Sequence, residues 1–74
     1  FNGLSNLISL DLSKNQIKII RNRTFFGLNN LRILDLKFNL IQLVEEDGLI
    51  DLIKLDELYL STYKMLQIKK RLFL

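Results

Sequence analysis

The 74-residue chain contains no cysteine, no histidine and no proline, and only three glycines. Without cysteine and histidine it can form neither a disulfide nor a Cys/His zinc site, the two usual supports of a small domain. The common nucleophile–base pairs of enzymes need the same residues and are excluded with them. The absence of cysteine does not decide between a secreted and an intracellular protein, because a piece of a secreted protein can simply lack cysteines.

Several sequence patterns of other protein classes are also missing. The glycines Gly3, Gly27 and Gly48 stand alone, so neither a GxxxxGK[ST] nor a GxGxxG phosphate loop is present. No apolar run approaches the roughly 20 residues that span a bilayer. The net charge of +3 is too small to indicate nucleic-acid binding by itself. We therefore expect no enzyme, no cofactor, no metal site, no specific nucleic-acid partner and no membrane span within this segment.

What the chain does have is leucine at a fixed spacing. Hydrophobic residues make up 49% of the sequence, and shifting the chain by 24 residues superposes most of them. The recurring sets are Leu7, Leu31 and Leu55; Leu10, Leu34 and Leu58; Leu12, Leu36 and Leu60; Ile17, Ile41 and Met65; Ile20, Val44 and Ile68. Such a repeat indicates a solenoid, in which each unit buries its apolar face against its neighbours.

Each unit opens with an alternation that is typical of a short strand. In 10–12 and 34–36 the leucines fall on one face and the aspartate on the other. The remaining apolar residues are three to five positions apart, which suits turns or one short helical turn. Strands stack about 4.8 Å apart, whereas the return segments need more room. We therefore expect a curved stack with a parallel sheet on its concave side.

An asparagine interrupts the apolar pattern at the same place twice, in "LDLSKNQI" (Asn15) and in "LDLKFNLI" (Asn39). A turn that leaves a strand frees backbone N–H and C=O groups, each costing about 1–3 kcal/mol if unpaired. A carboxamide supplies both donors and an acceptor. We expect both side chains to point inward as a two-rung asparagine ladder. The third copy has Tyr63 at this position, so we expect the ladder to end there.

These residues resemble the leucine-rich repeat family, whose pattern is LxxLxLxxNxΦxxΦxxxxFxxLxx, with Φ apolar. Residues 7–30 match it at every signature position, and residues 31–54 match with Leu49 in place of phenylalanine. Residues 55–74 form a truncated repeat without the asparagine, and residues 1–6 are the end of a preceding one. The chain as a whole, 1–74, is thus expected to be one segment of a longer repeat protein.

The resemblance implies a horseshoe solenoid of α/β type, with one short strand per repeat and an irregular or short-helical convex side. Within the family, the 24-residue length and the Phe25-Phe26-Gly27-Leu28 ending look like the extracellular subtype. That subtype builds Toll-like receptor, Slit-like and related cell-surface ectodomains. It implies an extracellular or cell-surface location and a protein ligand or co-receptor, with homo-association as an alternative partner interaction.

The outward positions of the sheet are the candidate binding surface. By the alternation they are Ser9, Asp11, Ser13, Ile33, Asp35, Lys37, Glu57, Tyr59 and Ser61. Exposed Ile33 and Tyr59 would flank Asp35, a mixture of apolar and charged groups that interfaces favour. Phe38 would extend this patch at the end of the strand. The alternative is that these are ordinary surface residues and that the ligand binds other repeats.

Three smaller motifs each have a structural alternative. Asn22-Arg23-Thr24 is an N-x-T sequence, so Asn22 is a candidate glycosylation site on the outward return segment. The acidic run 45–47 lacks the alternating spacing of calcium loops, which favours a solvated turn. The basic cluster 69–71 and the lysines and arginines of the first repeat lie mostly on return segments, which favours a solvated face over an acidic ligand.

We expect the chain to be a protein-binding module of an extracellular leucine-rich repeat ectodomain, in a Toll-like or related receptor. Two rivals remain from other classes. One is an adhesive or matrix protein in which the repeats form a rigid spacer or self-associate. The other is a cytosolic repeat scaffold, which a glycan on Asn22 would exclude.

Overall fold

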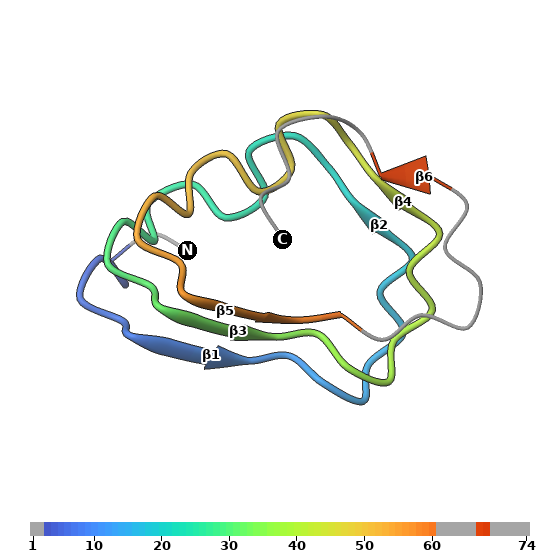
Figure 1. Ribbon diagram of the computed structural model, residues 1–74, viewed down its shortest axis with the longest axis horizontal. Helices are drawn as coiled ribbons and strands as arrows, with labels where there is room; N and C mark the ends of the chain where they lie inside the picture. The colour runs from blue at the N-terminus through green and yellow to red at the C-terminus, as the bar shows by residue number, and fades with distance from the viewer. Residues whose placement is uncertain (1–2, 61–66, 69–74) are drawn as a thin grey trace.

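The computed structural model describes residues 3–60 together with the backbone of 67–68. These residues form six short strands, and the described part contains no helix (Figure 1). No helix that is long and apolar enough to cross a membrane occurs among the described residues. The predictions made for Phe1, Ser61, Tyr63, Met65 and the basic cluster 69–71 lie outside the described residues.

The first sheet contains the strands that the leucine–aspartate alternation predicts. Strands β1 (Ser9–Asp11), β3 (Ile33–Asp35) and β5 (Glu57–Tyr59) are parallel and lie in the order β1-β3-β5. Leu10 pairs with Leu34, and Leu34 pairs with Leu58, so each residue lies beside its counterpart one repeat away. This parallel stacking confirms a repeat solenoid.

A second parallel sheet was not expected. Strands β2 (Ile19–Ile20), β4 (Leu43–Val44) and β6 (Gln67–Ile68) pair in the order β2-β4-β6, along an adjacent side of each coil (Figure 1). The expectation of one strand per repeat is therefore wrong, because two strands occur in each. Ile19, Ile20 and Val44 are β-branched, and such side chains favour extended backbone stacked on a matching neighbour.

Turns rather than a helix close the third side of the two coils whose return segments the structure describes. The N–H of Leu28 donates to the carbonyl of Phe25, and that of Leu52 donates to the carbonyl of Leu49. These are single turns, and they place the apolar residues inward without propagating into a helix. Gly27 adopts φ 95°, a left-handed conformation that residues with a Cβ rarely take.

The interior is filled by the residues that recur in the sequence. The buried apolar side chains are Ile20, Phe25, Leu28, Leu31, Leu34, Leu36, Ile41, Val44, Leu49 and Leu52. Burial of each such side chain contributes about 1.5–3 kcal/mol. Their counterparts Leu10 and Leu58 are only partly buried, because each packs against the core from one side. Within the described residues, the second coil therefore contributes most of the buried core.

Candidate functional site

The candidate site is the outward-facing surface of the first sheet, opposite the core. We call it the outer face and define it by the described members of the predicted set: Ser9, Asp11, Ser13, Ile33, Asp35, Lys37, Glu57 and Tyr59. Parallel register arranges the strand residues in rows across β1, β3 and β5. One row is Ser9, Ile33 and Glu57, and the next is Asp11, Asp35 and Tyr59. The ninth predicted residue, Ser61, lies outside the described part of the chain.

Two aspartates lie next to each other in the second row. Asp11 and Asp35 are paired residues of neighbouring parallel strands. Like charges directly opposite each other in a sheet are destabilising. Local hydrogen bonds offset part of this cost: Oδ1 of Asp11 accepts from the N–H and the hydroxyl of Ser13, at 2.9 and 2.6 Å. Oδ1 of Asp35 accepts from the N–H of Lys37 at 3.0 Å.

The hydrogen bonds at Asp11 also set its charge. The Ser13 hydroxyl, and after it the Ser13 backbone N–H, lower the pKa of Asp11 below its ordinary value of 3.8. Desolvation opposes these two hydrogen bonds and comes next in size, and weaker attraction to Lys37 and Lys14 again lowers the pKa. Asp11 is therefore ionised at neutral pH, and the outer face carries its negative charge.

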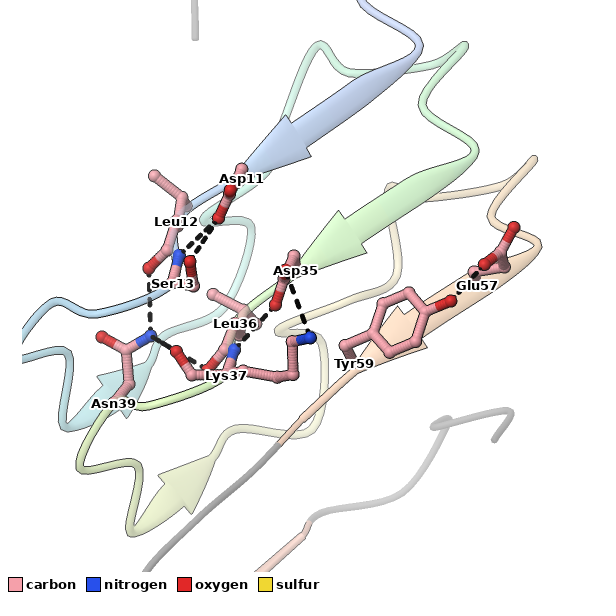
Figure 2. Close-up of polar contacts among 9 residues, drawn as sticks. All are labelled: Asp11, Leu12, Ser13, Asp35, Leu36, Lys37, Asn39, Glu57 and Tyr59. Carbon is pink, nitrogen blue, oxygen red and sulfur yellow. Dashed lines mark hydrogen bonds and ion pairs between the residues drawn. The ribbon is translucent and has the colours of Figure 1, made fainter.

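Lys37 lies within reach of both Asp35 and the ring of Tyr59. Its Nζ is 3.9 Å from Oδ2 of Asp35 and 5.2 Å from the centre of the Tyr59 ring. Figure 2 shows the lysine side chain reaching back along the outer face toward these two groups. An ammonium near an aromatic face and a carboxylate is attracted by both. The outer face thus holds a cation of its own.

Tyr59 contributes the largest exposed apolar group on the outer face, with 42% of its surface accessible. Its hydroxyl donates a hydrogen bond to Oε1 of Glu57 (Figure 2). This hydrogen bond, helped by the negative charges of Glu57 and Asp35, raises the pKa of Tyr59 above its ordinary value of 10.0. The ring is therefore neutral and held along the strand by its own hydroxyl.

Ile33 and Phe38, two apolar residues of the predicted patch, differ in their exposure. Ile33 is partly buried rather than exposed, because it lies between Ser9 and Glu57 on the flanking strands. Phe38 is 63% exposed and has φ 60°. Lys14, at the same place in the first repeat, has φ 59°, so the conformation belongs to the turn and not to this phenylalanine.

The two asparagines have the same local contacts but different burial. Asn39 is 4% exposed, and its Nδ2 donates to the carbonyls of Leu36 and Leu12, at 2.9 and 3.0 Å (Figure 2). Its Oδ1 accepts from the N–H of Ile17. Asn15 donates to the carbonyls of Leu12 and Ser13 within its own coil, and its side chain is exposed rather than buried. The difference follows from position, since Asn15 belongs to the first coil and Asn39 to the second.

Asn22, the candidate glycosylation site, makes two hydrogen bonds to the next coil. Its backbone N–H donates to Oε1 of Glu45, and its Oδ1 accepts from the N–H of Asp47 at 2.9 Å. The residue is exposed. Two members of the acidic run 45–47 are thus occupied in pairing neighbouring coils. Among the residues described, no group of three or more acidic, histidine or cysteine side chains is arranged to hold a metal ion.

Arg23 forms a second cross-coil contact on the return side. Its Nε donates to Oδ2 of Asp51 at 2.8 Å, and its guanidinium lies 4.9 Å from the centre of the Phe26 ring. The hydrogen bond and the charge of Asp51 raise the pKa of Arg23. Arg23 and Phe26 border an open hollow of about 430 Å³ that is also lined by Thr24 and Asn29. The carboxylate of Asp51 already balances its arginine, so the hollow offers no net charge to a ligand.

Sequence reasoning missed the contacts that run from one coil to the next. It placed Lys37 on the outer face, but not beside the ring of Tyr59. It treated Asn22 as a surface residue, without its bonds to Glu45 and Asp47. The 24-residue register contained the signal, because it places residue 59 beside residue 35 and residue 47 beside residue 23.

Comparison with known proteins bears directly on the repeat. A search among curated proteins and a search among solved structures each found no match. The sequence profile of the leucine-rich repeat matches residues 1–41 and, in a second overlapping match, residues 20–62. Members of this family generally act as protein-interaction modules rather than as enzymes. With most of its length matched and its strands stacked at the repeat spacing, the chain belongs to the leucine-rich repeat family.

Proposed function

We propose that the chain is part of an extracellular leucine-rich repeat ectodomain, of a Toll-like or related cell-surface receptor, that binds a protein ligand or co-receptor through the outer face. In this proposal the outer face is the concave side of a longer horseshoe. The observation that supports it is the alignment of outward side chains in rows across three paired strands. Repeat proteins use such extended rows to contact other proteins.

The chemistry of the outer face suits a protein partner. Interfaces commonly combine an exposed aromatic anchor with charged and hydrogen-bonding groups around it. Tyr59 is such an aromatic group, and Asp35, Lys37 and Glu57 surround it. Because neighbouring coils fix the strand backbones, the backbone that carries these groups loses little conformational freedom when a partner binds.

Photo-crosslinking tests this assignment. A photoreactive amino acid at Ser9 would be exposed on the outer face, and one at Lys18 would be exposed on a return segment. On cells that express the parent protein, we expect the Ser9 probe to capture a protein partner and the Lys18 probe to capture much less. Equal capture at both positions, or capture only at Lys18, would overturn the proposal that the outer face is the binding surface.

The extracellular location rests on the subtype pattern of residues 25–28 and on the N-x-T sequence at Asn22. A glycan would attach to Nδ2 of Asn22, whereas the bond to the next coil uses Oδ1. Attachment is therefore compatible with the cross-coil hydrogen bond. Peptide mass spectrometry of the native protein, with and without enzymatic deglycosylation, tests the site. A glycan on Asn22 supports both proposals, and an unmodified Asn22 overturns the glycosylation proposal.

A further inference from the structure

The outer face contains a site that suits a cation, and a lysine of the same chain occupies it. Asp35 supplies a carboxylate and Tyr59 supplies an aromatic ring, and the ammonium of Lys37 lies near both. Figure 2 shows these three side chains on the outward side of β3 and β5. A carboxylate beside an aromatic ring is a combination that suits a guanidinium group in particular, because this group can stack and hydrogen-bond at the same time.

The Lys37 ammonium occupies this place only weakly. A separation of 3.9 Å between Nζ and Oδ2 of Asp35 is too long for a hydrogen bond. The lysine side chain is 44% exposed, and exposed ion pairs of this kind contribute little. Displacing Lys37 into water therefore costs little, since its flexible stem lets the ammonium leave while the backbone stays fixed.

The surrounding charge favours an incoming cation over an anion. Asp11, Asp35 and Glu57 place three carboxylates on the described outer face, against the single ammonium of Lys37, a net charge of −2. The whole chain carries a net charge of +3, so the outer face is opposite in sign to the rest of the molecule. A patch of this kind attracts a basic partner segment and repels an acidic one.

We propose that the outer face binds an arginine side chain from a protein partner, whose guanidinium takes the place that Lys37 holds between Asp35 and Tyr59. This inference rests on the proposed protein-binding function and deepens it. The guanidinium forks onto the Asp35 carboxylate and stacks on the Tyr59 ring, and the neighbouring Asp11 adds attraction from the next strand. Lys37 acts as an internal competitor that the partner must displace.

The test uses a short glycine–serine peptide that carries arginines, titrated into the chain and followed by amide chemical shifts. We expect shifts around residues 35, 37 and 59, and weaker binding when citrulline replaces arginine, because citrulline keeps the shape and loses the charge. Asp35→Asn keeps the acceptor for the Lys37 N–H but removes the charge, and it should weaken binding about fivefold, the equivalent of one surface ion pair. Tyr59→Leu should weaken binding in the same direction.

Three further substitutions separate the specific site from general charge. Lys37→Gln removes the internal competitor and should tighten binding about twofold or more, whereas Lys18→Gln, on a return segment, should have a smaller effect. Glu46→Gln removes the same charge as Asp35→Asn from an exposed return position and should leave binding nearly unchanged. Equal binding of the citrulline peptide, or an equal loss in Glu46→Gln and Asp35→Asn, would overturn the inference.

Failure of the arginine-binding inference and failure of the proposed function give different experimental results. If the probe at Ser9 captures a partner whose crosslinked segment contains no arginine, the outer face is a binding surface and the arginine inference fails. If no partner is captured at Ser9, and the arginine peptide binds neither the outer face nor its Lys37→Gln variant, both fail. Circular dichroism of each variant checks that the fold is kept in every comparison.

Discussion

The side chain of Asn39 donates a hydrogen bond across the coils to the carbonyl oxygen of Leu12, with 3.0 Å between Nδ2 and O. The same side chain accepts from the N–H of Ile17 at 3.1 Å. One carboxamide thus satisfies backbone groups of the preceding coil, in addition to the Leu36 carbonyl of its own coil. Asn39 is 4% exposed, so water cannot readily replace these bonds.

Replacement of Asn39 should therefore be costly. Asn39→Ala leaves backbone groups of both coils unpaired, and we expect a loss of about 2–3 kcal/mol in the free energy of unfolding. Asn15→Ala is the matched control, because Asn15 has the same motif position but is exposed, and it should cost about 1 kcal/mol or less. Urea unfolding followed by circular dichroism measures both. Equal losses would show that Asn39 acts only within its own coil.

Phe38 is exposed and Phe25 is buried, so replacing them should have opposite effects on stability. Phe38 is 63% exposed in a left-handed turn, and Phe25 is 1% exposed in the core. Phe38→Gly should leave the free energy of unfolding unchanged or raise it by up to about 1 kcal/mol, because glycine accepts a positive φ. Phe25→Ala should lower it by about 3–5 kcal/mol. A large loss in Phe38→Gly would mean that its ring packs on the protein.

Gly48 should not tolerate a side chain. A Cβ at this position would lie 3.0 Å from Cγ2 of Ile20 and 3.1 Å from the carbonyl oxygen of Glu45. The second neighbour is backbone and cannot move aside easily, so Gly48→Ala should cost about 1–3 kcal/mol. Gly48→Asn, being larger, should cost more than Gly48→Ala.

Gly3 provides the comparison for Gly48, because a Cβ there would meet nothing within 4 Å. Its φ of +84° makes the cost one of backbone conformation alone. Asparagine tolerates this conformation better than alanine does, so Gly3→Asn should be milder than Gly3→Ala. At Gly48 the asparagine variant should therefore be less stable than the alanine variant, and at Gly3 it should be more stable. The same order at both would contradict the steric explanation for Gly48. Thermal unfolding of the four variants measures the order.

The contact between Ser13 and Asp11 should appear in acid titration. Because the folded state lowers the pKa of Asp11 below 3.8, the ionised carboxylate stabilises the fold above that value. This stabilisation is lost as the pH falls below 3.8 through the folded pKa. Ser13→Ala removes the largest cause of the shift, so the pKa of Asp11 should move back toward 3.8. Carbon-detected NMR of the Asp11 carboxyl measures it, and an unchanged pKa in Ser13→Ala would contradict this account.

The sequence predicted the first sheet well because the leucines at 10, 34 and 58 face the core and fix the register of every strand. It did not predict the second sheet. Strands of two residues, such as Ile19–Ile20, are too short to show an alternation, and their pairing depends on the coil above and below. A side-chain contact such as Lys37 with Tyr59 depends on the conformation of a flexible side chain, which no spacing rule specifies.

The expected two-rung asparagine ladder shows a different limit, because Asn15 makes the hydrogen bonds within its own coil but is exposed. Asn15 and Asn39 have the same local motif, and the motif alone predicts the same environment for both. Burial of the carboxamide depends on how many coils pack against it, which is a property of the stack and not of the motif. For Asn39 the preceding coil supplies Leu12 and Ile17 as partners.

The strand register described above also governs which changes in chain length this architecture accepts. Each residue of β1 and β3 lies beside the residue 24 positions later, as Leu10 does beside Leu34. A deletion of one residue within a strand would move the part of that strand on one side of the deletion to the opposite face, so that its leucine would leave the core. A duplication of a whole 24-residue unit would reproduce each interface unchanged. Gene duplication can therefore lengthen such a protein in whole turns, whereas single-codon insertions and deletions in the strands should be selected against.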